Sequence, residues 1–195
     1  MPPPRSVQVW LDPILARPEG SAFPPLIWDL MVHPNNIRLG SATGFSRAQV
    51  LSKPDLERYA AAYVDNGAHV PLRTITLRLH QLPRDIEIVP TTLPYVTVRD
   101  VLYELYRTLR ISVERGEYRD LPRREREALQ DAFRARLARV VDPFARAEDE
   151  RYGIRRIDFL GDRRVFLGLL PAVGHDIPYG KRAGEAFMVD VVRAL

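Results

Sequence analysis

An alternation of apolar and polar residues marks the middle of the chain. Within Arg73–Leu79 every second residue is apolar, and Asp85–Val89 repeats the pattern after a short interruption. Successive side chains of a β-strand point to opposite faces, so each run predicts a strand with one apolar face. The residues between them, 80–84, are typical of a turn, and the two runs together predict an antiparallel hairpin.

Three other stretches follow the period of an α-helix. In Ser52–Val64, Thr97–Ile111 and Pro122–Val140 apolar residues recur at intervals of three and four, which places them on one helix face. Thr97 and Asp100 match a capping box at the start of the second stretch, and proline suits the first position of the third. We therefore predict three helices. The apolar face of the third holds Ala128, Leu129, Ala132, Phe133, Leu137 and Val140.

The C-terminal part of the chain carries a second hairpin pattern. Ile157–Leu160 and Val165–Leu169 are apolar and rich in strand-forming residues, and Gly161-Asp162 between them suits a tight turn. After a loop rich in glycine and proline, Ala186–Val192 predicts a last strand, although its length also fits a short helix.

Proline is frequent from residue 1 to about residue 45. Because proline lacks a backbone N–H and restricts the residue before it, we predict an extended, irregular N-terminal segment. Two short apolar pieces interrupt this segment, Val7–Leu11 and Leu26–Val32, and each contains one of the two tryptophans. We expect Trp10 and Trp28 to anchor the segment by packing, because a buried indole covers a large apolar area.

Length and composition limit the architecture. The chain has 195 residues, of which 46% are hydrophobic, and a chain of this length can form one core. We predict a single globular domain over residues 1–195. Because the predicted strands and helices are partly segregated along the chain, the fold class is α+β, with an antiparallel or mixed β-sheet and two or three helices packed on one face.

Features that the chain lacks exclude several classes of protein. It contains no cysteine, which excludes disulfides, thiolate zinc sites and cysteine nucleophiles. No apolar run approaches the roughly 18 residues that would span a bilayer, and the N-terminus carries no apolar run of the signal-peptide kind. These features predict a cytoplasmic or nuclear protein without a membrane partner.

Four blocks of sequence stand in a fixed order. They are Asp12–Leu15, Pro25–Leu30 with His33-Pro34 behind it, Val96–Leu102, and Arg155–Gly161 continuing into Phe166–Leu169. Together they resemble an uncharacterised domain family found mainly in fungi, especially basidiomycetes, and known as a domain of unknown function. The resemblance supports the fold class and the intracellular location, and it implies no activity. It also implies an extended segment over Leu56–Val64, where the apolar spacing predicts a helix.

Five polar residues are the candidates for a pocket or for structural polar contacts. They are Asp29, His33, Arg156, Asp158 and His175. A carboxylate beside a histidine can act as a base and the group that orients it, so an enzyme cleft is one interpretation. Structural hydrogen bonds and ion pairs are favoured, because the four histidines lack metal-ligand spacing and the chain contains no glycine-rich phosphate loop or G-x-S-x-G elbow. We assign no catalytic, cofactor-binding or metal-binding residue.

The most concentrated basic patch consists of Arg155, Arg156, Arg163 and Arg164. The predicted hairpin turn at 161–162 would bring the two arginine pairs close together across the ladder. Four guanidinium groups repel one another unless acidic side chains or a phosphate-bearing partner lie between them. Neutralisation by Asp158, Asp162 and the acidic run 148–150 is favoured, because the net charge is only +4 and the basic runs are interleaved with acids.

These observations favour a non-catalytic binding or protein-interaction module. Its partner would be another protein or a second copy of the chain, and no cofactor is expected. A small-molecule enzyme with an Asp/His/Arg-lined cleft is the alternative, and arginine-mediated nucleic-acid binding is a weaker one.

Overall fold

The protein has an α+β fold, as the sequence predicts, and its described residues form two β-sheets and five α-helices. The computed structural model describes residues 8–18, 20, 24–40 and 50–194. The larger sheet has six strands in the order β3-β2-β8-β9-β6-β7, and the smaller has three in the order β1-β4-β5. Pairing is antiparallel throughout except between β6 and β9, so the larger sheet is mixed. Pro2 to Pro4 lie outside the described residues.

The strands of the larger sheet, and the helix α2 that packs beside it, have the following bounds. The strands are β2 (Leu26–Asp29), β3 (Arg38–Leu39), β6 (Ile75–Arg78), β7 (Ile86–Ile88), β8 (Arg163–Pro171) and β9 (Ala186–Arg193), and the helix packed beside β7 is α2 (Val98–Leu109). The β6–β7 hairpin is confirmed, with Ile75 opposite Ile88. Residues 186–193 form a strand, which decides between the two interpretations of this segment.

Helix α2 begins and packs as its sequence predicts. The Thr97 hydroxyl accepts a hydrogen bond from the Asp100 backbone N–H, and the Asp100 carboxylate accepts one from the Thr97 backbone N–H at 2.9 Å. Apolar side chains from one face of the helix, including Val101, Leu102 and Leu105, are fully buried in the main core. The capping box and the apolar stripe therefore fix one end and one face of α2.

The predicted helix over Ser52–Val64 is wrong beyond its first turns. Helix α1 covers Lys53–Glu57, and the chain then enters strand β4 (Ala61–Asp65), as the family resemblance implies. Strand β4 pairs with β1 (Val9–Leu11) on one side and with β5 (Ala68–Pro71) on the other. Backbone pairing with two neighbours outweighs the helical spacing of a few apolar side chains, which the sequence pattern does not weigh.

The predicted hairpin over Ile157–Leu169 is also wrong. Residues Arg156–Leu160 form a short 3-10 helix, η2, and β8 pairs with β2 and β9 instead. The Asp158 carboxylate accepts a hydrogen bond from the Arg155 backbone N–H at 2.9 Å, which favours a helical turn over a strand. Gly161 then ends η2 with φ +56°, a conformation that favours glycine.

The two apolar pieces of the N-terminal segment both become strands. Trp28 in β2 lies in the main core, and its indole N–H donates to the Val32 carbonyl at 2.8 Å, so it anchors the segment as expected. Trp10 in β1 remains partly exposed. At Gly168 in β8, φ is +139°, and a Cβ would lie 2.5 Å from the Arg17 backbone nitrogen. Glycine at 168 therefore allows the segment after β1 to cross close to the larger sheet.

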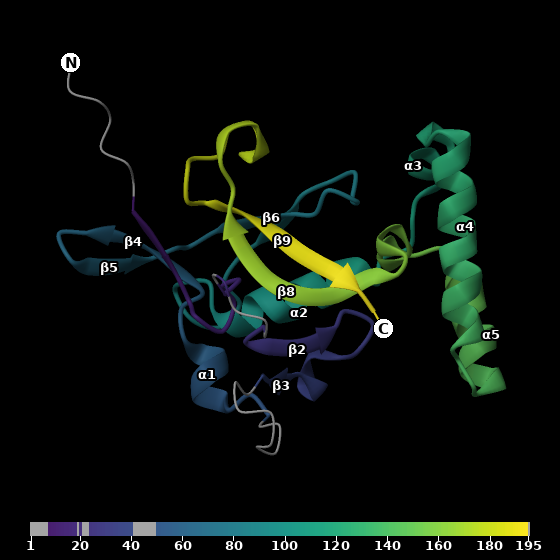
Figure 1. The fold of residues 1–195 in the computed structure, drawn as a ribbon, viewed down its shortest axis with the longest axis horizontal. Helices are drawn as coiled ribbons and strands as arrows, with labels where there is room; N and C mark the ends of the chain where they lie inside the picture. The colour runs from purple at the N-terminus through teal and green to yellow at the C-terminus, as the bar shows by residue number, and fades with distance from the viewer. Residues whose placement is uncertain (1–7, 19, 21–23, 41–49, 195) are drawn as a thin grey trace.

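Three helices lie together at the end of the molecule opposite β4 and β5 (Figure 1). They are α3 (Arg115–Asp120), α4 (Arg123–Ala138) and α5 (Pro143–Tyr152). The predicted third helix is thus confirmed as α4, which contacts α5 and η2. Its predicted apolar face is partly wrong. Leu129 is buried as predicted, but Ala128 is exposed, and Arg136, which lies outside that face, is buried. Within the described residues, no helix is long and apolar enough to cross a membrane.

Candidate functional site

Asp29, the first of the sequence candidates, joins two neighbouring strands. Its Oδ2 accepts a hydrogen bond from Arg164 Nε of β8 at 2.9 Å, and its Oδ1 accepts from the Met31 backbone N–H at 2.9 Å. The Arg164 side chain is 10% exposed, so this ion pair lies largely out of water. Both carboxylate oxygens are therefore occupied by structural partners.

The two candidate histidines lie on separate parts of the surface. His33 precedes η1 (Pro34–Asn36), and its Nδ1 accepts a hydrogen bond from the Asn35 backbone N–H at 3.2 Å. Its ring packs edge-on against Tyr106 of α2 with 5.0 Å between centroids. His175 is exposed, with Nε2 3.7 Å from Asp176 Oδ1. Neither histidine bonds to Asp29 or Asp158, so the structure does not form the carboxylate–histidine pair of the enzyme alternative.

Asp158 belongs to a buried ionic network that the sequence does not predict. Arg136 of α4 donates from Nε to Asp158 Oδ1 at 2.7 Å and from Nη2 to Oδ2 at 3.1 Å. The two side chains are 4% and 2% exposed. Arg136 also donates to Asp149 of α5 at 2.9 Å and to the Gly153 carbonyl at 2.9 Å. One guanidinium therefore connects α4, α5 and η2.

The four arginines of the basic patch do not meet across a hairpin, because η2 replaces the first strand. Arg155 pairs with Asp149 of α5 at 2.8 Å, and Arg164 of β8 pairs with Asp29 of the neighbouring strand β2. Arg163 is exposed opposite Arg193 of β9. Arg156 is half-buried, and its Nε has no partner among the described residues. Two of the four are thus neutralised within the protein, Arg155 by Asp149 of the expected acidic run 148–150 and Arg164 by Asp29, which was not expected.

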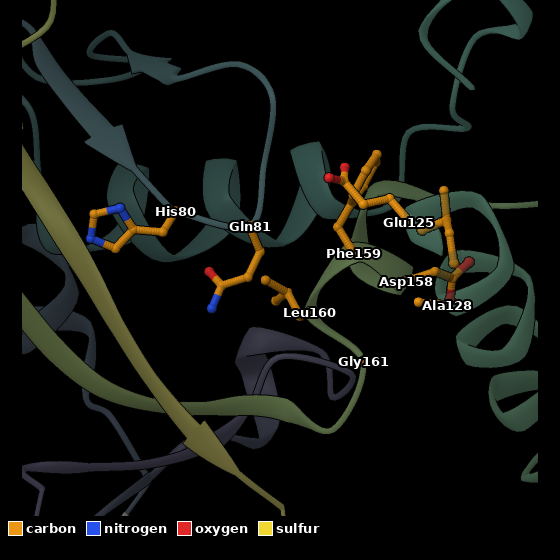
Figure 2. Close-up of a pocket in the computed structure, with 9 residues that line it drawn as sticks. His80, Gln81, Glu125, Ala128, Asp158, Phe159, Leu160 and Gly161 are labelled. Carbon is orange, nitrogen blue, oxygen red and sulfur yellow. The ribbon is translucent and has the colours of Figure 1, made fainter. Parts of the chain in front are cut away.

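A cleft of about 350 Å³ separates α4 from the loop after β6. It is lined by His80, Gln81, Glu125, Ala128, Leu129 and the η2 residues Asp158 to Gly161. Figure 2 shows His80 at one end of this cleft, and Glu125 and Asp158 at the other. The Asp158 oxygens are held by Arg136 and by the Arg155 backbone N–H, and Glu125, the other carboxylate of the lining, lies at the end of the cleft away from His80 (Figure 2). Among the described residues, no three His, Asp or Glu side chains gather closely enough to hold a metal ion.

A larger groove, of about 610 Å³, lies between α2 and the end of the six-stranded sheet. We call it the α2–β7 groove. One wall consists of Glu87, Val89, Thr91 and Thr92, and the other of Arg99, Asp100, Tyr103, Glu104, Tyr106 and Arg107. Strand β7 is the last strand of the sheet and pairs with β6 alone. The groove therefore runs along a sheet edge.

The hydrogen-bond pattern of β6 determines which backbone groups of β7 face this edge. The Thr76 backbone N–H donates to the Glu185 carbonyl beside β9, so Ile75 and Leu77 direct their backbone groups toward β7. Their partners Ile88 and Ile86 bond back to β6. Glu87, between them, consequently points its N–H and C=O away from β6 and toward the open edge, where no described residue pairs with them.

The charged side chains of the α2 wall are balanced within the wall. Glu104 forms a two-point pair with Arg107 at 2.9 Å, and the Asp100 carboxylate accepts hydrogen bonds from Thr97 and from the Thr91 hydroxyl. The Arg99 guanidinium lies 5.2 Å from the centre of the Tyr103 ring. The wall thus offers aromatic surface and paired charges, without a reactive group beside the open strand.

Sequence reasoning misses this groove because a sheet edge is a property of strand order. The β6–β7 hairpin is legible in the alternation, but the neighbours of each strand are set by pairings with residues 163–193. One sequence signal was present: Val89-Pro90 follows the second strand, and proline marks strand ends and edges.

Comparison with known proteins identifies a family, but the description of that family states no function. A family model described as a family of unknown function (DUF6699) matches residues 26–182. The match contains the whole α2–β7 groove and begins after the block Asp12–Leu15. No curated protein and no solved structure matches the chain.

Proposed function

The chain belongs to the family of unknown function DUF6699, whose description carries no activity, and we propose from the groove itself that the protein is a non-catalytic interaction module. Its ligand is an extended peptide segment of another protein, which adds as a further strand to β7 and lies against α2. We further propose a fungal origin, from the family resemblance, and a cytoplasmic or nuclear location, from the sequence.

The open backbone of Glu87 carries the proposal. An edge strand presents unpaired N–H and C=O groups in the spacing that a further strand needs, and peptide-binding domains use such edges for recognition. The α2 wall would contact alternate side chains of the added strand, because side chains of an extended peptide point alternately to the two faces. Val89, which is 55% exposed at the groove, supplies apolar surface on the β7 side.

The settings of the sequence candidates support a binding role over catalysis. Asp29 and Asp158 are each held by an arginine and a backbone N–H, and the histidines lie apart from both. A general base needs a free lone pair within reach of a substrate proton. A binding groove needs no such group.

A proline substitution tests the proposal at one backbone atom. Glu87→Pro removes the N–H that faces the edge and leaves the β6–β7 bonds in place, because those bonds use Ile86 and Ile88. Peptides selected from a random library on the wild-type protein would be titrated against each variant by fluorescence anisotropy. We expect Glu87→Pro to weaken binding at least tenfold, since one hydrogen bond is lost and the edge is sterically blocked.

Two controls make the result specific. Glu87→Ala removes the carboxylate, which pairs with Lys181 at 3.2 Å, but keeps the backbone donor, and it should bind as the wild type does. Circular dichroism should show that both variants remain folded. Equal affinity of the selected peptides for Glu87→Pro and wild type would refute strand addition at β7.

A further inference from the structure

A second hollow, lined by aromatic rings, lies on the small sheet. Its volume is about 400 Å³, and we call it the aromatic pocket. It is lined by Trp10, Asp12, Pro13, Arg58, Tyr59 and Tyr95. It shares no lining residue with the α2–β7 groove, so it constitutes a separate surface.

The rings of the aromatic pocket are held at fixed angles. Trp10 and Tyr59 have centroids 4.9 Å apart and planes tilted by 57°, and Tyr95 stands edge-on to Tyr59 at 6.2 Å. His69 of β5 fixes this arrangement from behind, because its Nδ1 shares a hydrogen bond of 2.8 Å with the Tyr59 hydroxyl and its ring lies 5.1 Å from that of Trp10. A ligand would meet aromatic faces that are already in position, which lowers the entropic cost of binding.

The charges at the pocket disfavour a cationic ligand. Arg58 binds Asp12 through two hydrogen bonds, from Nε at 2.7 Å and from Nη2 at 2.6 Å, and the Asp12 carboxylate is fully buried. The hydrogen bonds that Arg58 donates to Asp12 raise the pKa of Arg58, against the opposite effect of desolvation. The arginine therefore stays protonated in the pocket wall, and the carboxylate that balances it is buried and already paired. An aromatic cage for an ammonium group needs the opposite arrangement.

The pocket contains two hydrogen-bond donors that the described residues leave unused. Among the described residues, nothing accepts a hydrogen bond from the Trp10 indole N–H or from the Tyr95 hydroxyl, and both rings are half-buried. The matching ligand presents carbonyl acceptors together with apolar rings that stack on aromatic faces. A polyproline II segment has this chemistry, because its carbonyls make no internal hydrogen bonds and proline has no N–H.

We propose that the aromatic pocket binds a proline-rich segment of a partner protein in the polyproline II conformation. Proline rings stack on Trp10 and Tyr59, and the indole and Tyr95 hydroxyl donate to ligand carbonyls. Aromatic-lined grooves recognise such segments because the ligand is already extended and loses little entropy on binding. The proposal stands on the ring geometry and the donor set, and it does not depend on strand addition at β7.

Tryptophan fluorescence offers a direct test. The chain has two tryptophans, and Trp28 is 1% exposed, so a fluorescence change on ligand addition reports Trp10. The probe is an acetylated, amidated oligoproline peptide, titrated into the chain of 195 residues. We expect a saturable change for the wild type, and the same change for Tyr179→Phe, a fully exposed tyrosine elsewhere. A trimethyllysine peptide should give no saturable change.

Two variants of the pocket complete the test, with binding followed by isothermal calorimetry. Trp10→Ala should abolish binding of oligoproline, and Tyr95→Phe, which keeps the ring and removes the donor, should weaken it roughly fivefold. Circular dichroism would establish that Trp10→Ala is folded, and Tyr95→Phe retains a test if it is not. Failure of oligoproline to bind the wild type, equal binding to Tyr95→Phe, or preferential binding of trimethyllysine would each overturn the proposal.

Discussion

One arginine side chain connects helices α4 and α5 and the short helix η2. Arg136 is 4% exposed, and it donates to Asp158, Asp149 and the Gly153 carbonyl. A buried ion pair pays a large desolvation penalty and is stable only when further hydrogen bonds satisfy both partners. The backbone N–H of Arg155 supplies such a bond to Asp158. Removing one member leaves the other charge buried without its partner.

Asp158→Asn tests this network at a single atom pair. The amide replaces one acceptor oxygen with a donor, so a hydrogen bond from Arg136 or from the Arg155 backbone N–H is lost, and Arg136 keeps Asp149 alone as its counter-charge. We therefore expect a loss of about 3 kcal/mol in the free energy of unfolding. The matched control is Asp162→Asn, because the Asp162 carboxylate pairs with Arg193 at an exposed position and should contribute less than about 1 kcal/mol. Urea denaturation of both variants measures the difference. Equal losses would show that burial of the Arg136 pair has no special effect.

Arg136 also shows where sequence reasoning ends at the scale of the residue. The apolar face predicted for residues 122–140 does not include this arginine, and its partner Asp158 is 22 positions away. A charged side chain is buried only where another segment of the chain supplies its partner, and the spacing of apolar residues does not reveal that partner. Trp28, by contrast, is predictable, because an indole within a short apolar run needs only a core and one acceptor.

Among the elements, α2 is the one that its sequence determines most completely. Its capping box, apolar stripe and length all agree, and the sheet covers the face that the pattern marks as apolar. Helix α1 has the same capping signal through Ser52 and Asp55, yet it ends at Glu57. The difference lies in the following residues, since the Ala60 backbone N–H donates to the Val96 carbonyl and its carbonyl accepts from Asp12. Non-local backbone bonds therefore decide where α1 stops.

Leu105→Ala tests the inner face of α2. The side chain is fully buried in the main core, so its truncation should cost about 2–5 kcal/mol through lost transfer energy and the cavity left behind. Arg134→Ala on α4 is the comparison, because that arginine is 71% exposed and should cost about half a kcal/mol or less. Chemical denaturation gives both values, and comparable losses would contradict the assignment of the two faces.

Asp55→Asn tests the capping box of α1 through its pH dependence. Hydrogen bonds from the Ser52 side chain and backbone, together with the Arg58 charge, lower the pKa of Asp55 below its ordinary value. A carboxyl whose pKa is lower in the folded chain stabilises it fully above the ordinary pKa, and this stabilisation is lost as the pH falls through the folded value. We expect Asp55→Asn to destabilise the protein at pH 7, and the difference from wild type to shrink toward pH 3 in urea titrations. A difference that stays constant with pH would exclude the capping carboxylate as its source.

At the scale of the molecule, strand order creates the features that bear on binding. The α2–β7 groove exists because β9 inserts between β6 and β8, which leaves β7 as the last strand. The aromatic pocket exists because β4 brings Tyr59 beside Trp10 of β1. The local pattern predicts most of the strands and helices but not their neighbours, and both candidate sites depend on those neighbours. The fold class was therefore within reach of sequence reasoning, and the sites were not.

The distribution of charge over the whole molecule leads to the last prediction, which is weak binding of nucleic acid. Among the described residues, ten arginines are already paired with carboxylates within the protein. Ion pairs with carboxylates involve Arg17, Arg58, Arg78, Arg107, Arg123, Arg134, Arg136, Arg155, Arg164 and Arg193. Affinity for a polyanion grows with the number of phosphates neutralised and counterions released, and paired arginines neutralise few. We therefore expect affinities weaker than micromolar for labelled DNA and RNA duplexes at about 150 mM salt, measured by fluorescence anisotropy. Asp149→Asn, which removes the partner of Arg155, should strengthen binding at low salt, because it removes one negative charge and leaves the Arg155 guanidinium without its carboxylate. Sub-micromolar affinity of the wild type with a steep dependence on salt would contradict this prediction and return the arginine patch to the list of functional surfaces.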